Sequence, residues 1–179
     1  MSEDPARYRA RALGDPNAGL RIAMEIGGTM EGLESAIALT KLAEKAGANA
    51  IKVQILDADR LVGIDRPVSW TDIHGTAHDD SMRDLLRRRH LDRKDWIALR
   101  DEIEADSMEF IATIDGPATL DLALELDADA LKLCSGDVTN LSWVEEISKA
   151  DLPIMLDTGH ATLGEIERAV DAASRAPAI

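Results

Sequence analysis

Lysines inside apolar runs are the residues of this sequence whose type and position most clearly suggest chemistry. Lys132 lies between two leucines in the run Ala130 to Asn140, ALKLCSGDVTN. Neighbouring side chains of a strand point to opposite faces, so Lys132 and Cys134 share one face. A buried ammonium group is costly unless it is compensated. Lys132 therefore has three interpretations: a partner of a carboxylate, a ligand of an anion, or a neutral amine for Schiff-base chemistry.

Other polar residues follow the same pattern in the remaining apolar runs. Each run carries polar residues in the phase opposite to its apolar ones, toward its C-terminal end: Glu25, Lys52, Gln54, Thr113, Lys132 and Asp157. Parallel sheets and barrels place their sites at the C-terminal ends of strands, so we expect these residues to share one face. Two lysines, a hydroxyl and small-residue loops suit a phosphate or carboxylate ligand. The alternative is an internal glutamate–lysine network in the core.

Alternating strand and helix patterns must position these residues. Strands are expected to begin near residues 21, 50, 109, 130 and 153. Helices are expected over Leu33 to about Gly47, Leu91 to Ala105, Pro117 to Leu126, Leu141 to Ala150 and Thr162 to Ser174. The apolar phase of the first strand predicts that Ile22 and Met24 pack against helices. The segment Asp57 to Ser81 has no clear periodicity, so we predict a long loop.

Strand and helix repeats spaced by roughly 20 to 30 residues are typical of a parallel α/β array. The chain has 179 residues, enough for one domain, whereas a closed (βα)8 barrel needs about 250. We therefore predict an α/β fold, either an open doubly wound sheet or about five βα units of a TIM-type (βα)8 barrel. This domain should cover 21–179, after a loose N-terminal leader over 1–20.

Composition restricts the partners and the compartment. The net charge of −14 argues against nucleic acid and anionic membranes, which need a basic surface. No apolar run approaches the roughly 20 residues of a membrane span, and the N-terminus lacks the apolar segment of a signal peptide. The single cysteine excludes an internal disulfide. We therefore expect a cytoplasmic protein.

Several segments resemble, in order and spacing, the N-acetylneuraminate (sialic acid) synthase family. They are IAMEIGG, AEKAGANAIKVQ, FIAT, LKLCSGDVTNL and PIMLDTGHATLGEIE, within about Arg21 to Ala172. The resemblance implies a homodimeric (βα)8 barrel that condenses phosphoenolpyruvate with the open-chain aldehyde of an N-acylated amino sugar. The products would be a nine-carbon 2-keto acid and phosphate. A divalent metal, Mn or Mg, is implied as cofactor, but the histidines that usually bind it come from later strands than those present here.

The resemblance also implies roles for particular residues. Lys52, Thr113, Lys132 and Ser135 fall on phosphoenolpyruvate-binding positions, and Gln54 and Asp157 complete the predicted substrate-binding set. Glu25 and Asp137 are the predicted catalytic residues. Glu25 falls on an acidic residue that could orient the sugar, the water or the metal. Asp137 stands in the loop beside the reacting centre, where many members have glutamate.

Two departures from the family leave other functions open. Asp157 replaces a serine of the family's Ser-Thr-Gly run, and this carboxylate would oppose an anionic substrate unless Lys132 or a metal compensates. Gly28, Thr29 and Met30 replace an Asn-His-Asn-like run. An incomplete barrel would also expose its first and fifth strands, so the chain is either part of a longer barrel or completed by a second chain. The alternatives are a degenerate barrel that binds an anionic metabolite or a partner chain without turnover, and a Schiff-base aldolase using Lys132.

Overall fold

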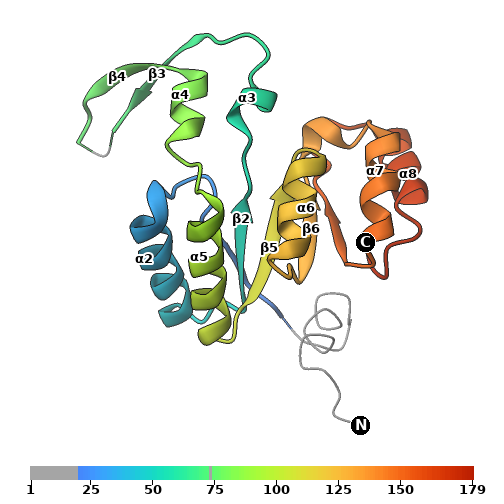
Figure 1. Ribbon diagram of the computed structural model, residues 1–179. Coiled ribbons are helices and arrows are strands. Elements are labelled where there is room, and N and C mark those ends of the chain that lie inside the picture. The colour runs from blue at the N-terminus through green and yellow to red at the C-terminus, as the bar shows by residue number, and fades with distance from the viewer. Residues whose placement is uncertain (1–19, 73) are drawn as a thin grey trace.

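The computed structural model of the chain describes residues 20–72 and 74–179. The predicted leader therefore lies outside the described residues, except for Leu20. Five parallel strands form one sheet in the order β1-β2-β5-β6-β7 (Figure 1). Their bounds are β1 Ala23–Glu25, β2 Ala50–Gln54, β5 Glu109–Ile114, β6 Ala130–Leu133 and β7 Ile154–Leu156.

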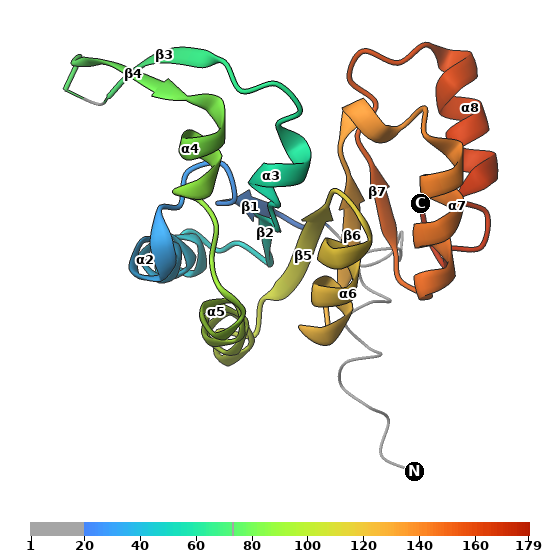
Figure 2. The same ribbon diagram turned by 45° about the horizontal axis from the view of Figure 1, so that its top comes forward.

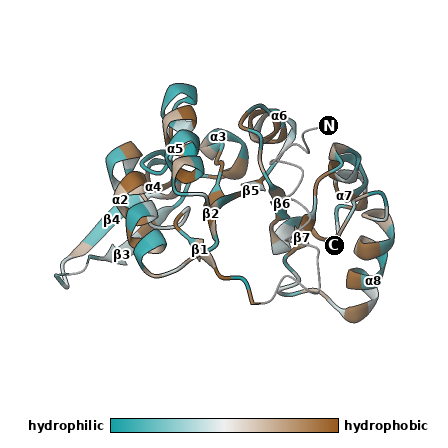
Figure 3. Cartoon of the chain, turned by 90° about the horizontal axis from the view of Figure 1, so that it is seen from below, coloured by the Kyte–Doolittle hydropathy of each residue, from teal (hydrophilic) through white to brown (hydrophobic). Residues whose placement is uncertain are grey.

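Helices connect these strands and cover one face of the sheet. The connecting helices are α2 Gly32–Lys45, α5 Arg93–Ala105, α6 Pro117–Glu125 and α7 Leu141–Ile147, the last followed by a 3-10 turn, and α8 Leu163–Ala172 follows β7. Figure 3 shows them in an arc outside the curved sheet. Sequential strand order with right-handed crossovers puts all helices on the same side. A doubly wound sheet has helices on both faces, so that alternative does not describe this chain.

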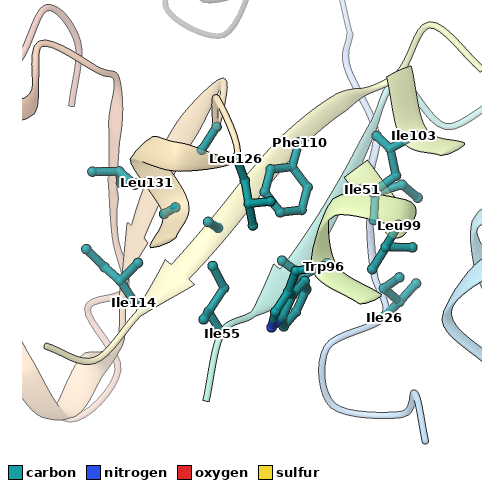
Figure 4. Packing of buried hydrophobic residues seen from close by; sticks show 14 of the residues in the cluster. Ile26, Ile51, Ile55, Trp96, Leu99, Ile103, Phe110, Ile114, Leu126 and Leu131 are labelled. Carbon is teal, nitrogen blue, oxygen red and sulfur yellow. The ribbon is translucent and has the colours of Figure 1, made fainter. Parts of the chain in front are cut away.

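The main core lies between the sheet and these helices, as the apolar phase of the strands predicted (Figure 4). Trp96, Leu99 and Ile103 form the buried stripe of α5 that the sequence indicated, and they are at most 1% exposed. They face a continuous apolar surface of strand residues: Ile51, Val53, Phe110, Ala112, Leu131 and Leu133. A second, small cluster of Ala50, Ile111, Ala130 and Met155 lies on the opposite phase of the strands. The face without helices is therefore apolar at its N-terminal end and polar toward the C-terminal strand ends.

Local capping signals set several helix ends as expected. Thr162 and Glu165 form the predicted capping box at the start of α8. Pro117 is the first residue of α6. Gly47 follows the end of α2 with φ of +82°, a conformation that glycine adopts without strain. Asp92 delays the start of α5 to Arg93, because its side chain accepts a hydrogen bond from the backbone N–H of Asp95.

The first strand departs from the prediction. Ile22 and Met24 do not pack into the core, since they are 51% and 37% exposed. In the described part of the chain β1 pairs with β2 only, so it is an edge strand of the sheet (Figure 3). A strand needs cover on its outer face to bury apolar side chains, and the alternation of residues alone does not show whether that cover exists.

The predicted long loop is also wrong, because residues 57–81 contain regular structure. A short helix, α3 Ala58–Leu61, precedes an antiparallel hairpin of β3 Pro67–Thr71 and β4 Ala77–Ser81, and α4 Met82–Arg87 follows. The hairpin projects from the body of the protein (Figure 2). Trp70 stacks on His78 with 4.5 Å between ring centroids, and its Nε1 donates to Asp80. The charged residues of β4 give no apolar alternation, so the sequence pattern did not predict this strand. Its stabilising contacts are cross-strand pairs rather than buried apolar side chains.

Within residues 20–72 and 74–179, every helix is too short or too polar to span a membrane.

Candidate anion-binding site

The strand register brings the predicted polar residues together on the face without helices. Gln54 pairs with Thr113, and Thr113 pairs with Lys132, across three adjacent strands. Glu25 pairs with Lys52 one step closer to the N-terminal ends. Residues paired in register point to the same side of a parallel sheet. The sequence prediction of one shared polar face is therefore confirmed for these five residues.

Lys52 is neutralised by a carboxylate from the neighbouring strand. Its ammonium group forms an ion pair with Glu25 Oε2, and the other oxygen of Glu25 accepts a hydrogen bond from the N–H of Gly27 at 2.7 Å. The Lys52 side chain is only 12% exposed, whereas that of Glu25 is half exposed. Glu25 thus compensates the more buried charge of the pair.

Lys132 is paired in the same way on the other side of the site. Its Nζ lies 2.9 Å from Asp157 Oδ2, and Asp157 Oδ1 accepts from the N–H of Gly159 at 3.3 Å. These two hydrogen bonds, that from Lys132 first, hold the pKa of Asp157 below its usual range. Lys132 therefore compensates the negative charge of Asp157, which is one of the two possibilities that the sequence analysis gave.

Both lysines act on the same small region. Burial raises the pKa of the Cys134 thiol, and the charges of Lys132 and Lys52 oppose that rise. The same two lysines also favour the charged form of Asp157. The charges of both ammonium groups therefore reach the ends of β6 and β7, which favours a negatively charged group there.

Thr113 presents a free hydroxyl between these charged pairs. The residue is 1% exposed, and its Oγ1 has no hydrogen-bond partner among the residues that the structure describes. It lies in β5, which is buried along its whole length. An unpaired buried hydroxyl costs free energy. Thr113 Oγ1 is therefore a polar atom between two lysine-bearing strands that no described residue satisfies.

The loop after β6 supplies the remaining predicted residues. Ser135 and Asp137 lie in a 3-10 turn, Ser135–Asp137. A Cβ atom at Gly159 would lie 3.5 Å from that of Ser135, so the loops after β6 and β7 lie side by side. Partial burial raises the pKa of Asp137, and the nearby charge of Asp115 adds to this rise.

Asp115 was missed by the sequence prediction. It follows β5 directly, accepts a hydrogen bond from Thr119 Oγ1 at 2.8 Å and lies 3.3 Å from the backbone nitrogen of Asp57. Its position directly after the strand is the sequence signal for Asp115, because parallel sheets place their sites at the C-terminal ends of strands. Asp115 and Asp137 place two carboxylates near each other at the ends of β5 and β6.

The divalent metal implied by the resemblance has no complete set of ligands here. Among residues 20–72 and 74–179, no group of three or more His, Cys, Asp or Glu side chains is arranged to hold a metal ion.

A protein-family model matches most of this chain. The model of the NeuB family matches residues 39–178. The chain belongs to the NeuB family. The matched range contains all the predicted site residues except Glu25, and it confirms the resemblance found in the sequence segments.

Two relatives of this NeuB-family chain are N,N'-diacetyllegionaminic acid synthases. It is 30% identical over 133 residues to N,N'-diacetyllegionaminic acid synthase of Campylobacter jejuni, covering 74% of this chain and 40% of the relative. It is 26% identical to the synthase of the same name from Legionella pneumophila, covering 78% of this chain and 39% of the relative. The chain thus spans about two fifths of the length of these curated relatives.

A solved structure supports the fold. The crystal structure of N-acetylneuraminic acid (sialic acid) synthetase from Leptospira borgpetersenii, in complex with citrate, superposes with a TM-score of 0.72 at 24% identity. The match covers 86% of this NeuB-family chain and 50% of the synthetase. The α/β fold with a mainly parallel sheet is therefore shared with a synthase.

Proposed function

We propose that this chain forms the phosphoenolpyruvate-binding part of a sialic-acid-synthase-like enzyme built on a TIM-type barrel. The reaction is condensation of phosphoenolpyruvate with the aldehyde of an N-acylated amino sugar, which yields a nine-carbon 2-keto sugar acid and phosphate. Membership of the NeuB family and the names of the relatives support this reaction class. The position of Lys52, Thr113 and Lys132 on one face of three adjacent strands supports an anionic ligand there.

The cations, the hydroxyls and one carboxylate of the site have separate roles in this proposal. The ammonium groups of Lys52 and Lys132 bind the phosphate and carboxylate of phosphoenolpyruvate, and the hydroxyls of Thr113 and Ser135 donate to their oxygens. C3 of phosphoenolpyruvate attacks the aldehyde, water adds at C2, and phosphate leaves by cleavage of its C–O bond. Glu25 orients the sugar or the water.

The Schiff-base alternative is less well supported. A Schiff-base lysine needs an apolar environment or a neighbouring cation that favours the neutral amine. Lys132 instead donates a hydrogen bond to the carboxylate of Asp157 at 2.9 Å. The arrangement favours a lysine that binds an anion over one that attacks a carbonyl.

The unpaired hydroxyl of Thr113 is the observation that carries the proposal, and Thr113→Val tests it. Valine keeps the shape of threonine and removes a hydroxyl that makes no hydrogen bond within the described chain. We expect phosphoenolpyruvate to bind about tenfold more weakly by calorimetric titration, because a hydrogen bond to a charged ligand is lost. Stability in urea should stay equal or rise by up to about 1 kcal/mol, since an unsatisfied buried group is removed.

Thr40→Val is the matched control. Thr40 is equally buried, but its hydroxyl donates to the carbonyl oxygen of Ala36 at 3.0 Å within α2. This variant should lose about 1 kcal/mol of stability and bind phosphoenolpyruvate normally. Unchanged phosphoenolpyruvate binding by Thr113→Val would show that its hydroxyl does not contact the ligand and would remove the main support for the proposed site.

A further inference from the structure

Asp157 is hydrogen-bonded to the ammonium group of Lys132, which an anionic ligand would also need as a partner. Its Oδ2 accepts a hydrogen bond from Lys132 Nζ at 2.9 Å. Lys132 neighbours Thr113 in register, so Lys132 and the unpaired hydroxyl belong to one binding surface. An anion that contacts both must approach an ammonium group that a carboxylate already holds, and the two negative charges repel each other.

Asp157 is free to leave this position, whereas Lys132 is not. The Asp157 side chain is 43% exposed, against 22% for Lys132, so its carboxylate can turn into water at small cost. The backbone of Lys132 is held in β6 between Leu131 and Leu133, both fully buried, and its side chain is about half as exposed as that of Asp157. Displacement of the pair would therefore move Asp157 and leave the ammonium group in place.

The position of Asp157 distinguishes it from the other carboxylate partner, Glu25. Glu25 falls on an acidic position of the family, and its second oxygen accepts from Gly27 N–H at 2.7 Å. Asp157 stands where the resemblance places a serine, and its second hydrogen bond, from Gly159, is longer at 3.3 Å. The carboxylate of Asp157 is thus the more weakly held of the two and the one particular to this chain.

We propose that Asp157 is an internal counter-ion, which neutralises Lys132 in the ligand-free protein and swings away when an anion binds. Asp157 is then a positioning residue that lowers the affinity of the site for anions. This inference rests on the proposed function, because the group that displaces Asp157 is the phosphate or carboxylate of phosphoenolpyruvate.

Titration of phosphoenolpyruvate into the full chain and into Asp157→Asn and Asp157→Ser tests this role. Both variants should bind about tenfold more tightly, because the competing negative charge beside the ligand is removed. Asp79→Asn is the matched control for the change in net charge. Asp79 lies on the exposed hairpin, where it accepts from Ser69 at 2.6 Å, and its replacement should change the affinity less than twofold.

The carboxyl group of Asp157 offers a direct second readout by carbon-13 nuclear magnetic resonance. In the free protein the hydrogen bonds from Lys132 and Gly159 keep its pKa low. Lys132 and Lys52 are the cations that act on it, and Cys134 and Asp137 are the other titratable groups at these strand ends. Displacement by phosphoenolpyruvate should raise the pKa of Asp157, since it loses a cationic partner and gains a negative neighbour.

The outcomes separate this inference from the proposed function. Binding that is lost in Lys132→Met but unchanged or weaker in Asp157→Asn, with no rise of the Asp157 pKa on binding, overturns the counter-ion role alone. Equal binding by the unmodified chain and by Lys132→Met contradicts the proposed site. A folded chain that binds no phosphoenolpyruvate in any of these forms contradicts both.

Discussion

We expect Lys132→Met to bind phosphoenolpyruvate about 100-fold more weakly than the unmodified chain, as measured by calorimetry. Methionine keeps the approximate length of the side chain but removes the ammonium group. In the proposed site this group and the Thr113 hydroxyl contact the same ligand. Loss of one partner from a hydrogen-bonded charge pair in a partly buried site weakens binding to this extent. The fold should persist with a cost of at most about 1 kcal/mol, since Asp157 remains accessible to water.

Lys149→Met provides the control for this variant. Lys149 forms an exposed ion pair with Glu146 on the surface, three residues away in the sequence. Its replacement makes the same change in net charge and should leave the affinity within about twofold. A Lys132→Met protein that matches Lys149→Met in affinity would show that the ligand does not contact β6.

The second large effect is expected for Gly27→Ala, which should destabilise the protein by about 3 kcal/mol in urea denaturation. A Cβ atom at Gly27 would lie 2.3 Å from the backbone nitrogen of Gln54 and 2.9 Å from the carbonyl carbon of Val53. Both contacts are to backbone atoms of the neighbouring chain segment, so no side chain can turn away to relieve them. The ends of β1 and β2 would have to separate, and Gln54 would leave the binding face.

Gly28→Ala is the natural comparison, because it adds the same methyl group one residue later. A Cβ atom at Gly28 meets no atom within 4 Å. This variant should change stability by no more than about 0.5 kcal/mol. Similar stabilities for the two variants would mean that β1 approaches β2 less closely than the structure indicates.

The sequence left two interpretations open for the polar face: an internal network of carboxylates and lysines, or a binding site for an anion. The structure has features of both. Lys52 and Lys132 each have a carboxylate partner, as expected of an internal network. Thr113 has none among the described residues, as expected of a site that awaits a ligand. Both observations are consistent with carboxylates that neutralise the two lysines in the ligand-free protein and with a hydroxyl that bonds only to a bound anion. The roles of Glu25 and Asp137 in catalysis stay predictions.

Much of the fold was predictable from local patterns. Alternation of residues located β2, β5, β6 and β7, and the capping residues Thr162 and Glu165 located the start of α8. These signals depend on contacts between residues close in sequence or on burial of one strand face. They failed for Ile22 and Met24, which stay exposed on the edge strand β1, because alternation does not show what covers a strand. They failed for the hairpin β3–β4, whose stability comes from pairs such as Trp70 and His78.

The sequence by itself determined which residues can form the site, because alternation in each strand fixes which side chains share a face. Alternation predicted that Lys52, Gln54, Thr113 and Lys132 lie on one face of the sheet, and the strand register agrees. Only the tertiary structure decided how these residues are paired. Whether Asp157 repels a ligand or holds Lys132, and whether Thr113 has a partner, depends on distances between separate strands. Strand pairing and register set those distances, and the alternation within a single strand does not encode them.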